Sequence, residues 1–110
     1  MDAPTPRVSS QMLGNYIGKV VRITGKVVSI SNDIVIESSD GGQVIVKNCD
    51  GGKINSSFVE MIAKVESSNQ IREMDCFNLG DNYDLKLAQA VIDIIHNPGL
   101  RSERAQPFPL

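Results

Sequence analysis

The chain has 110 residues, with 11 basic and 13 acidic side chains and a formal net charge of -2. This length suits one domain around one core, and the balanced charge excludes strong nonspecific binding to nucleic acid, which needs clustered Lys and Arg. Two cysteines and one histidine cannot complete a zinc set. The sequence therefore predicts no cofactor, metal, membrane span or small-molecule substrate.

The N-terminal part begins with residues 1–7, which carry two prolines and are expected to be a mobile tail. They lack the apolar stretch of a signal peptide. A short helical turn should begin after Ser9 or Ser10 and end at Gly18. Four apolar residues at helical spacing give this turn a side that can face the core: Met12, Leu13, Tyr16 and Ile17.

The first predicted strand covers residues 19–30. Its apolar side begins with a period of two, in Val21, Ile23, Gly25 and Val27. The period then slips, so that Val28 and Ile30 are expected to continue this side. A slip beside Gly25 predicts a bulge or a sharp bend, which would let one strand serve both sides of a small barrel.

Four more strands are predicted after this one, at residues 34–38, 43–47, 58–66 and 70–79. Asp40, Gly41 and Gly42 form a hairpin turn between the first two of them. In the third, the expected inward side chains are Val59, Met61, Ala63 and Val65. In the fourth, the expected core side carries Ile71, Phe77 and Leu79.

A helix is predicted from Tyr83 to His96, because this stretch lacks Gly and Pro, and Pro98 and Gly99 follow it. Asp81 or Asp84 can cap its start. Its apolar residues cover more than the one stripe that a surface helix needs. The helix therefore needs two neighbours, and the second is expected to be another protein, although the rest of the chain could also cover it.

Five short strands followed by a helix predict an all-β fold with a terminal helix, namely a single OB-fold, a five-stranded Greek-key barrel. The predicted barrel covers residues 8–80, the oligomerisation helix 81–97 and the C-terminal tail 98–110. An SH3-like barrel is the alternative, but it gives no reason for the terminal helix.

No catalytic set can be assembled from this sequence, because every Ser-His-Asp or Cys-His set must use His96. At a helix C-terminus a histidine more often complements the helix dipole. The paired glycines do not open a helix or precede a Lys-Ser or Lys-Thr ending, so no phosphate loop is predicted. We therefore expect that this protein is not an enzyme.

OB-folds bind single strands across their second and third strands, on aromatic side chains in a basic groove. The corresponding stretches here, 34–38 and 43–47, contain no aromatic residue. The expected contribution to DNA binding is weak at most. Its candidate contacts, which are otherwise solvated charges, are Arg22, Lys26, Lys47 and Lys64.

The sequence resembles the small (14 kDa) subunit of replication protein A, the eukaryotic heterotrimeric single-stranded DNA-binding protein, from about Arg7 to His96. The matching patterns are Met12-Leu13, Tyr16 to Lys19, Gly25 to Val27, Val59-Glu60 and, most specifically, Tyr83 to Leu87 with Ala90 to His96. Residues 48–57 and the tail from Asn97 depart from the family pattern.

The resemblance implies that the terminal helix packs with helices of the large and middle subunits in a three-helix bundle. It implies a nuclear complex that protects single strands in replication, repair and recombination, in which this subunit has little DNA affinity. The bundle contacts implied are Leu85, Leu87, Ala88, Val91, Ile92 and Ile95. The alternatives are an autonomous single-stranded DNA-binding OB-fold protein and the small OB subunit of a telomere-capping complex.

Overall fold

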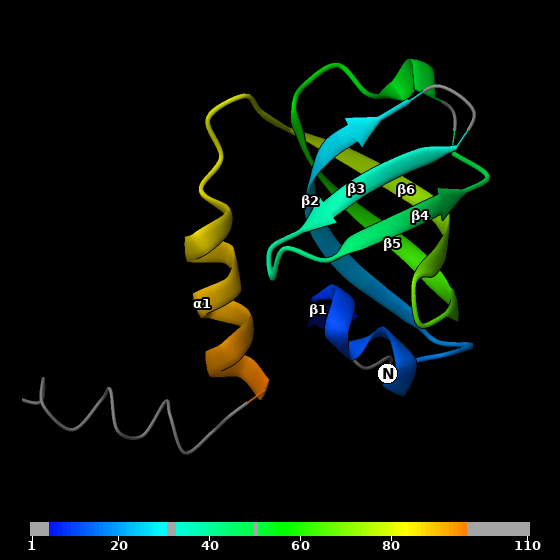
Figure 1. Cartoon of the computed structure of the whole chain (residues 1–110), viewed down its shortest axis with the longest axis vertical. Helices are drawn as coiled ribbons and strands as arrows, with labels where there is room; N and C mark the ends of the chain where they lie inside the picture. The colour runs from blue at the N-terminus through cyan, green and yellow to red at the C-terminus, as the bar shows by residue number, and fades with distance from the viewer. Residues whose placement is uncertain (1–4, 31–32, 50, 97–110) are drawn as a thin grey trace, which may run out of the picture.

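The computed structural model describes residues 5–30, 33–49 and 51–96. Most of the predicted N-terminal tail, the C-terminal tail 98–110 and part of the expected turn at residues 31–33 lie outside this description. Within it, a curved sheet closes into a barrel, and one α-helix lies along its side (Figure 1). The barrel strands are β2 (Val20–Ser29), β3 (Ile34–Ser38), β4 (Gln43–Lys47), β5 (Phe58–Ser67) and β6 (Gln70–Gly80).

The strand order is β1-β2-β3-β4-β6-β5, in which β1 is the two-residue strand Arg7–Val8, and β5 pairs again with β2, which closes the barrel. The pairs β2–β3, β3–β4, β2–β5 and β5–β6 are antiparallel, whereas β4–β6 is parallel. Such a five-stranded Greek-key barrel is the OB-fold, so the predicted fold class is confirmed. The five predicted strands are also confirmed, with ends that differ by one residue at most.

Aliphatic side chains fill the barrel, because alternate residues of each strand point inward. The predicted inward row of β5 is confirmed, since each of its members is at most 1% exposed. The 3₁₀ helix η1 (Ser10–Asn15) and β1 add residues to the same core. Its buried members are Val8, Leu13, Val21, Ile23, Ile34, Ile36, Val44, Val46, Val59, Met61, Ala63, Val65 and Ile71.

The bulge in β2 lies later than predicted. Its pairing with β3 shifts between Val27 and Ser29, so Val28 is the extra residue. Val28 and Ile30 are 44% and 48% exposed, and the prediction that they continue the core side was wrong. Gly25 instead marks a close approach of strands, because a Cβ there would lie 2.8 Å from the Glu37 carbonyl oxygen.

A second bulge reverses the faces of β6. Ala63 pairs with Glu73 and Ile62 with Asp75, which leaves Met74 as the extra residue. Beyond this bulge the odd-numbered residues point outward. Phe77 is therefore 44% exposed, and its predicted place on the core side was wrong.

The N-terminal segment contains a strand that the sequence did not predict. This strand, β1 (Arg7–Val8), pairs in parallel with β2 and begins at the last residue of the predicted tail. The expected turn is the 3₁₀ helix η1 (Ser10–Asn15), and Gly18 follows it with a φ of +84°. The prediction that Ile17 faces the core was wrong, because this side chain is 55% exposed.

The connections carry the expected turn chemistry. Gly41 has a φ of +89° in the β3–β4 hairpin, as the Asp-Gly-Gly sequence predicted. The 3₁₀ helix η2 (Gly51–Lys53) lies in the loop between β4 and β5. There the Lys53 ammonium lies 3.5 Å from the carboxylate of Glu73, whose residue is 5% exposed.

The terminal helix, α1 (Leu85–His96), begins two residues later than predicted. The Asp84 side chain caps it, because its Oδ1 accepts the N–H groups of Lys86 and Leu87 at 3.0 and 3.1 Å. Asp81 instead accepts the Ser57 N–H at 2.8 Å. In the described part of the chain, α1 and every other helix are too short or too polar to cross a membrane.

Candidate partner interface on the C-terminal helix

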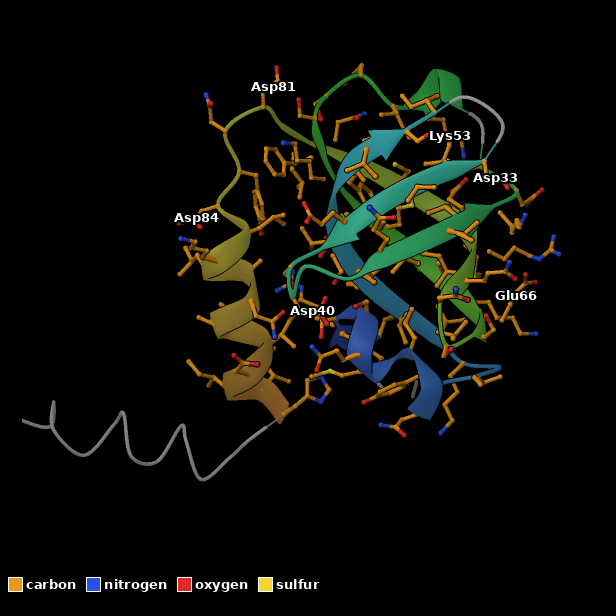
Figure 2. The ribbon with its side chains drawn as sticks, viewed as in Figure 1. Asp33, Asp40, Lys53, Glu66, Asp81 and Asp84 are labelled. Carbon is orange, nitrogen blue, oxygen red and sulfur yellow. The ribbon has the colours of Figure 1, made fainter. Side chains whose placement is uncertain are left out.

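Contacts along its length hold α1 beside the barrel. Near its middle, the Ser39 hydroxyl donates a hydrogen bond of 2.7 Å to the Gln89 side-chain oxygen. At its end, His96 Nε2 lies 2.7 Å from the Arg7 carbonyl oxygen, to which it can only donate. Figure 2 shows Asp84 and Asp81 at the opposite end, where the helix and its preceding segment leave β6.

Aromatic contacts support both ends of α1. The ring centroids of Tyr16 and His96 are 6.4 Å apart in an edge-on arrangement. Those of Phe58 and Tyr83 are 6.2 Å apart. Distances of this size are typical of favourable ring pairs.

One side of α1 is packed against its own barrel, and we call it the inner face. Ile92 is at its centre and is 3% exposed. Leu85 and Ala88 lie beside it and are half-buried. Three of the six predicted interface residues thus contribute to packing within this chain.

The other three predicted residues form a second apolar row, which we call the outer stripe: Leu87, Val91 and Ile95. They are 63%, 38% and 41% exposed, and their spacing of four residues places them along one side of the helix. Tyr83, 37% exposed, precedes this row by another four residues. The outer stripe spans about 12 Å, or about two turns.

Polar residues occupy the remaining side of α1. Lys86 and Asp93 are exposed, and the Gln89 amide donates to the Asp93 carboxylate at 2.9 Å. A surface helix of a monomer needs one apolar stripe. Here the apolar surface extends beyond the inner face, as the two-sided sequence pattern predicted.

A groove of about 240 Å³ runs between α1 and the outside of the sheet. On α1 it is lined by Leu87 and Val91 of the outer stripe and by Ala88 and Ile92 of the inner face. On the barrel, charged residues of β1 and β5 contribute to its lining. Its lining consists of Arg7, Thr24, Glu60, Leu79, Tyr83, Leu87, Ala88, Val91 and Ile92.

Sequence reasoning missed several of these lining residues. Arg7 was assigned to a tail, and its two-residue strand has no periodicity that could reveal it. Leu79 was expected on the core side and is half-buried, next to the bulge at the end of β6. Tyr83 stands four residues before Leu87, and this spacing was a signal that could have extended the apolar row.

The four candidate DNA contacts do not form one site. Arg22 and Lys26 lie on β2 and Lys64 lies on β5, whereas Lys47 lies on β4. Arg22 forms an ion pair with Glu60 at 3.5 Å, and Lys47 forms one with Asp33 at 3.2 Å. These pairings reduce the positive charge available for a phosphate backbone.

The outer surface of β3 and β4 presents aliphatic rather than aromatic side chains. Val35 pairs with Ile45 there, and both are half-buried. The aromatic residues described, namely Tyr16, Phe58, Phe77 and Tyr83, all lie outside these two strands. Successive bases stack on aromatic rings in single-strand-binding grooves, so this surface lacks the usual platform.

The residues that the structure describes are not arranged for metal binding or for thiol chemistry. No three His, Cys, Asp or Glu side chains gather there in a group that could hold a metal. Cys49 and Cys76 are both half-buried. Burial, with the nearby Glu73 carboxylate, raises the pKa of the Cys76 thiol, which disfavours the reactive thiolate.

This chain is similar to known proteins in sequence and in fold. The family model for Replication factor A protein 3 matches residues 1–99. Replication factor A protein 3 of Schizosaccharomyces pombe is 27% identical over 96 residues, which cover 87% of this chain and 92% of that protein. A chain of U. maydis Replication protein A, solved bound to ssDNA, is 33% identical with a TM-score of 0.77, and the match covers 91% and 97% of the two chains.

A chain in the S. pombe Stn1-ten1 complex also superposes, with a TM-score of 0.70 over 87% of this chain and 95% of that one. Its sequence identity is 9%, so this likeness concerns the fold alone. The family model, in contrast, matches the sequence over the barrel and the helix together. This chain therefore belongs to the Replication factor A protein 3 family.

Proposed function

We propose that this protein is the small subunit of a replication protein A heterotrimer and holds its core together through α1. The observation that carries this proposal is the outer stripe, which stays exposed although the inner face is already packed on the barrel. Helices of the large and middle subunits cover it in a three-helix bundle. The assembled complex binds single-stranded DNA in the nucleus and acts in replication, repair and recombination.

The free energy of burying apolar side chains supports a stable contact between the outer stripe and partner helices. Full burial of a large aliphatic side chain contributes about 1.5–3 kcal/mol. Leu87, Val91 and Ile95 are already partly shielded, so each gains less than this from a partner. Matching apolar residues from two partner helices add their own burial, which offsets the cost of association. A helix of 12 residues is marginal alone, and packing on both sides stabilises it.

The subunit itself has little DNA affinity in this proposal. Base stacking on aromatic side chains is worth about 1–3 kcal/mol per base, and the β3–β4 surface has no such residue. The competing autonomous binder would need a basic groove, but Arg22 on β2 and Lys47 on β4 are each paired with a carboxylate. DNA therefore binds mainly through the other subunits.

The small OB subunit of a telomere-capping complex is the second candidate, because the fold likeness to the Stn1-ten1 chain is close. Fold alone does not select a partner. The family match in sequence favours replication protein A partners. Co-expression with both sets of partners distinguishes the two, because the outer stripe can bind stably only to helices that fit it.

The direct test of the contact between the outer stripe and its partners is the double variant Val91→Asp/Ile95→Asp. It places two unpaired carboxylates where partner helices exclude water, and such buried charge costs several kcal/mol. We expect co-purification with the large and middle subunits to fall by at least about 100-fold. The isolated variant should keep its barrel, because both side chains are exposed in this chain.

Lys86→Glu is the matched control, since it also lowers the net charge by two but lies on the polar side of α1. It should co-purify normally. Normal co-purification of the double variant would contradict the proposed function.

A further inference from the structure

Two arginines share one carboxylate beside the C-terminal end of α1. Arg7 Nε lies 3.3 Å from Glu60, and Arg22 lies 3.5 Å from the same carboxylate. Glu60 is largely covered, with 14% of its side chain exposed, whereas those of Arg7 and Arg22 are 49% and 36% exposed. The trio thus carries a formal charge of +1 on its exposed side.

This trio adjoins the outer stripe. Arg7, Arg22 and Ile95 line one hollow of about 400 Å³, together with Thr5 and Pro6. Arg7 and Glu60 also line the groove that contains Val91. Ile95, the last residue of the outer stripe, therefore lies next to a positively charged hollow.

We propose that this hollow binds an acidic side chain of a partner helix that packs on the outer stripe. The inference rests on the proposed function and adds a source of specificity for the partner, namely the charge of this hollow. Apolar residues of that helix cover Leu87, Val91 and Ile95, and one Asp or Glu at the end of the contact pairs with Arg7 and Arg22. The excess positive charge argues for this occupant, because a carboxylate brings the local charge to zero.

The chemistry of arginine suits this role. A guanidinium has five N–H donors, and the contacts with Glu60 use one nitrogen of each arginine. Its planar fork can bind a carboxylate through two parallel hydrogen bonds. The Ile95 side chain and the covering partner would exclude water, which strengthens such a pair.

A phosphate of single-stranded DNA has related chemistry, but the surroundings favour a protein carboxylate. A nucleic-acid strand is usually bound along its length by a row of cationic side chains and aromatic rings. Here the hollow opens next to the apolar row of α1, and it also contains Pro6 and Ile95. A partner helix matches both the charge and the apolar wall.

The experiment uses the complete heterotrimer and the double variant Arg7→Gln/Arg22→Gln. We expect the dissociation constant of this subunit for its partners to rise roughly tenfold at moderate salt. Assembly should also become less sensitive to salt, because a charge pair has been removed. The matched control is Lys64→Gln/Arg72→Gln, which removes two exposed charges from a cross-strand pair elsewhere and should change the affinity little.

Glu60→Gln keeps the test decisive if the double arginine variant folds poorly. It removes the competing carboxylate and raises the charge of the hollow, so assembly should tighten and depend more strongly on salt. If the three residues only stabilise the fold, Glu60→Gln should weaken assembly or leave it unchanged. That result would overturn the inference.

Two further outcomes separate the possibilities. If Arg7→Gln/Arg22→Gln assembles normally while Val91→Asp/Ile95→Asp does not, only this inference is overturned and the proposed function stands. If the arginine variant assembles normally but the trimer binds labelled single-stranded DNA more weakly, the occupant is a phosphate and the inference is also overturned.

Discussion

The two faces of α1 have similar composition and different surroundings. Ile92 on the inner face is 3% exposed, whereas Leu87 on the outer stripe is 63% exposed. Both are large aliphatic residues, so residue type alone does not decide which is covered within the chain. The difference shows that the barrel covers one side of the helix and leaves the other side exposed.

The largest effect on the isolated chain is expected at the inner face. Ile92→Ala removes a buried side chain and leaves a cavity, which typically costs about 2–5 kcal/mol. We expect α1 to detach and lose helicity while the barrel stays folded, because Ile92 is not part of the barrel cluster. Circular dichroism and hydrogen exchange of residues 85–96 measure this loss.

Leu87→Ala makes the matched change on the outer stripe. The isolated chain should keep its helicity and its stability within about 0.5 kcal/mol, because the side chain is mostly exposed. Assembly with the large and middle subunits should weaken by roughly tenfold or more, as expected of a core interface residue. Equal effects of the two alanine variants on the isolated chain would break the distinction between the faces.

Asp84→Ala tests the start of the helix, which both faces share. The Asp84 carboxylate accepts two backbone N–H groups, and loss of such a cap costs about 1 kcal/mol. Helicity of the isolated chain should fall slightly, and assembly should weaken by less than tenfold. Asp84→Asn should preserve both, because its side-chain oxygen can still accept these bonds.

A smaller, pH-dependent effect is expected at the β3–β4 hairpin, which contacts Gln89 of α1 through Ser39. Burial alone would raise the pKa of Asp40, but hydrogen bonds from Gln11, Ser10, Gly42 and Ser38 bring it below the ordinary 3.8. Figure 2 shows Asp40 at the end of this hairpin, facing η1.

Because its pKa is lowered in the folded state, Asp40 stabilises the fold above the unfolded pKa, and this contribution is lost as pH falls through the folded pKa. Urea unfolding at neutral pH and at about pH 2–4 should show this loss. Asp40→Asn should be less stable at neutral pH and less sensitive to acid. An unchanged acid sensitivity would show that other carboxylates account for it.

The alternating strands and the terminal helix were predictable from the sequence, because local periodicity determines which residues can be buried together. The row from Val59 to Val65 illustrates this, since it lies in a regular strand. Asp84 was one of two predicted caps, and the Asp-Gly-Gly turn was recognisable by its residue types.

The remaining features depend on contacts between distant segments. Bulges at Val28 and Met74 arise from pairing with β3 and β5, and each reverses the face of the following residues. β1 exists because Arg7 and Val8 pair with β2, and two residues carry no pattern. The division of α1 into two faces likewise required the position of the barrel.

The most direct measurement is a fluorescence-anisotropy titration with labelled single-stranded DNA at moderate salt, performed on the isolated chain and on the reconstituted heterotrimer. We expect no measurable binding by the isolated chain and tight binding by the heterotrimer. Tight, salt-sensitive binding by the isolated chain would contradict this expectation, because the outer surface of β3 and β4 would then be a working DNA groove.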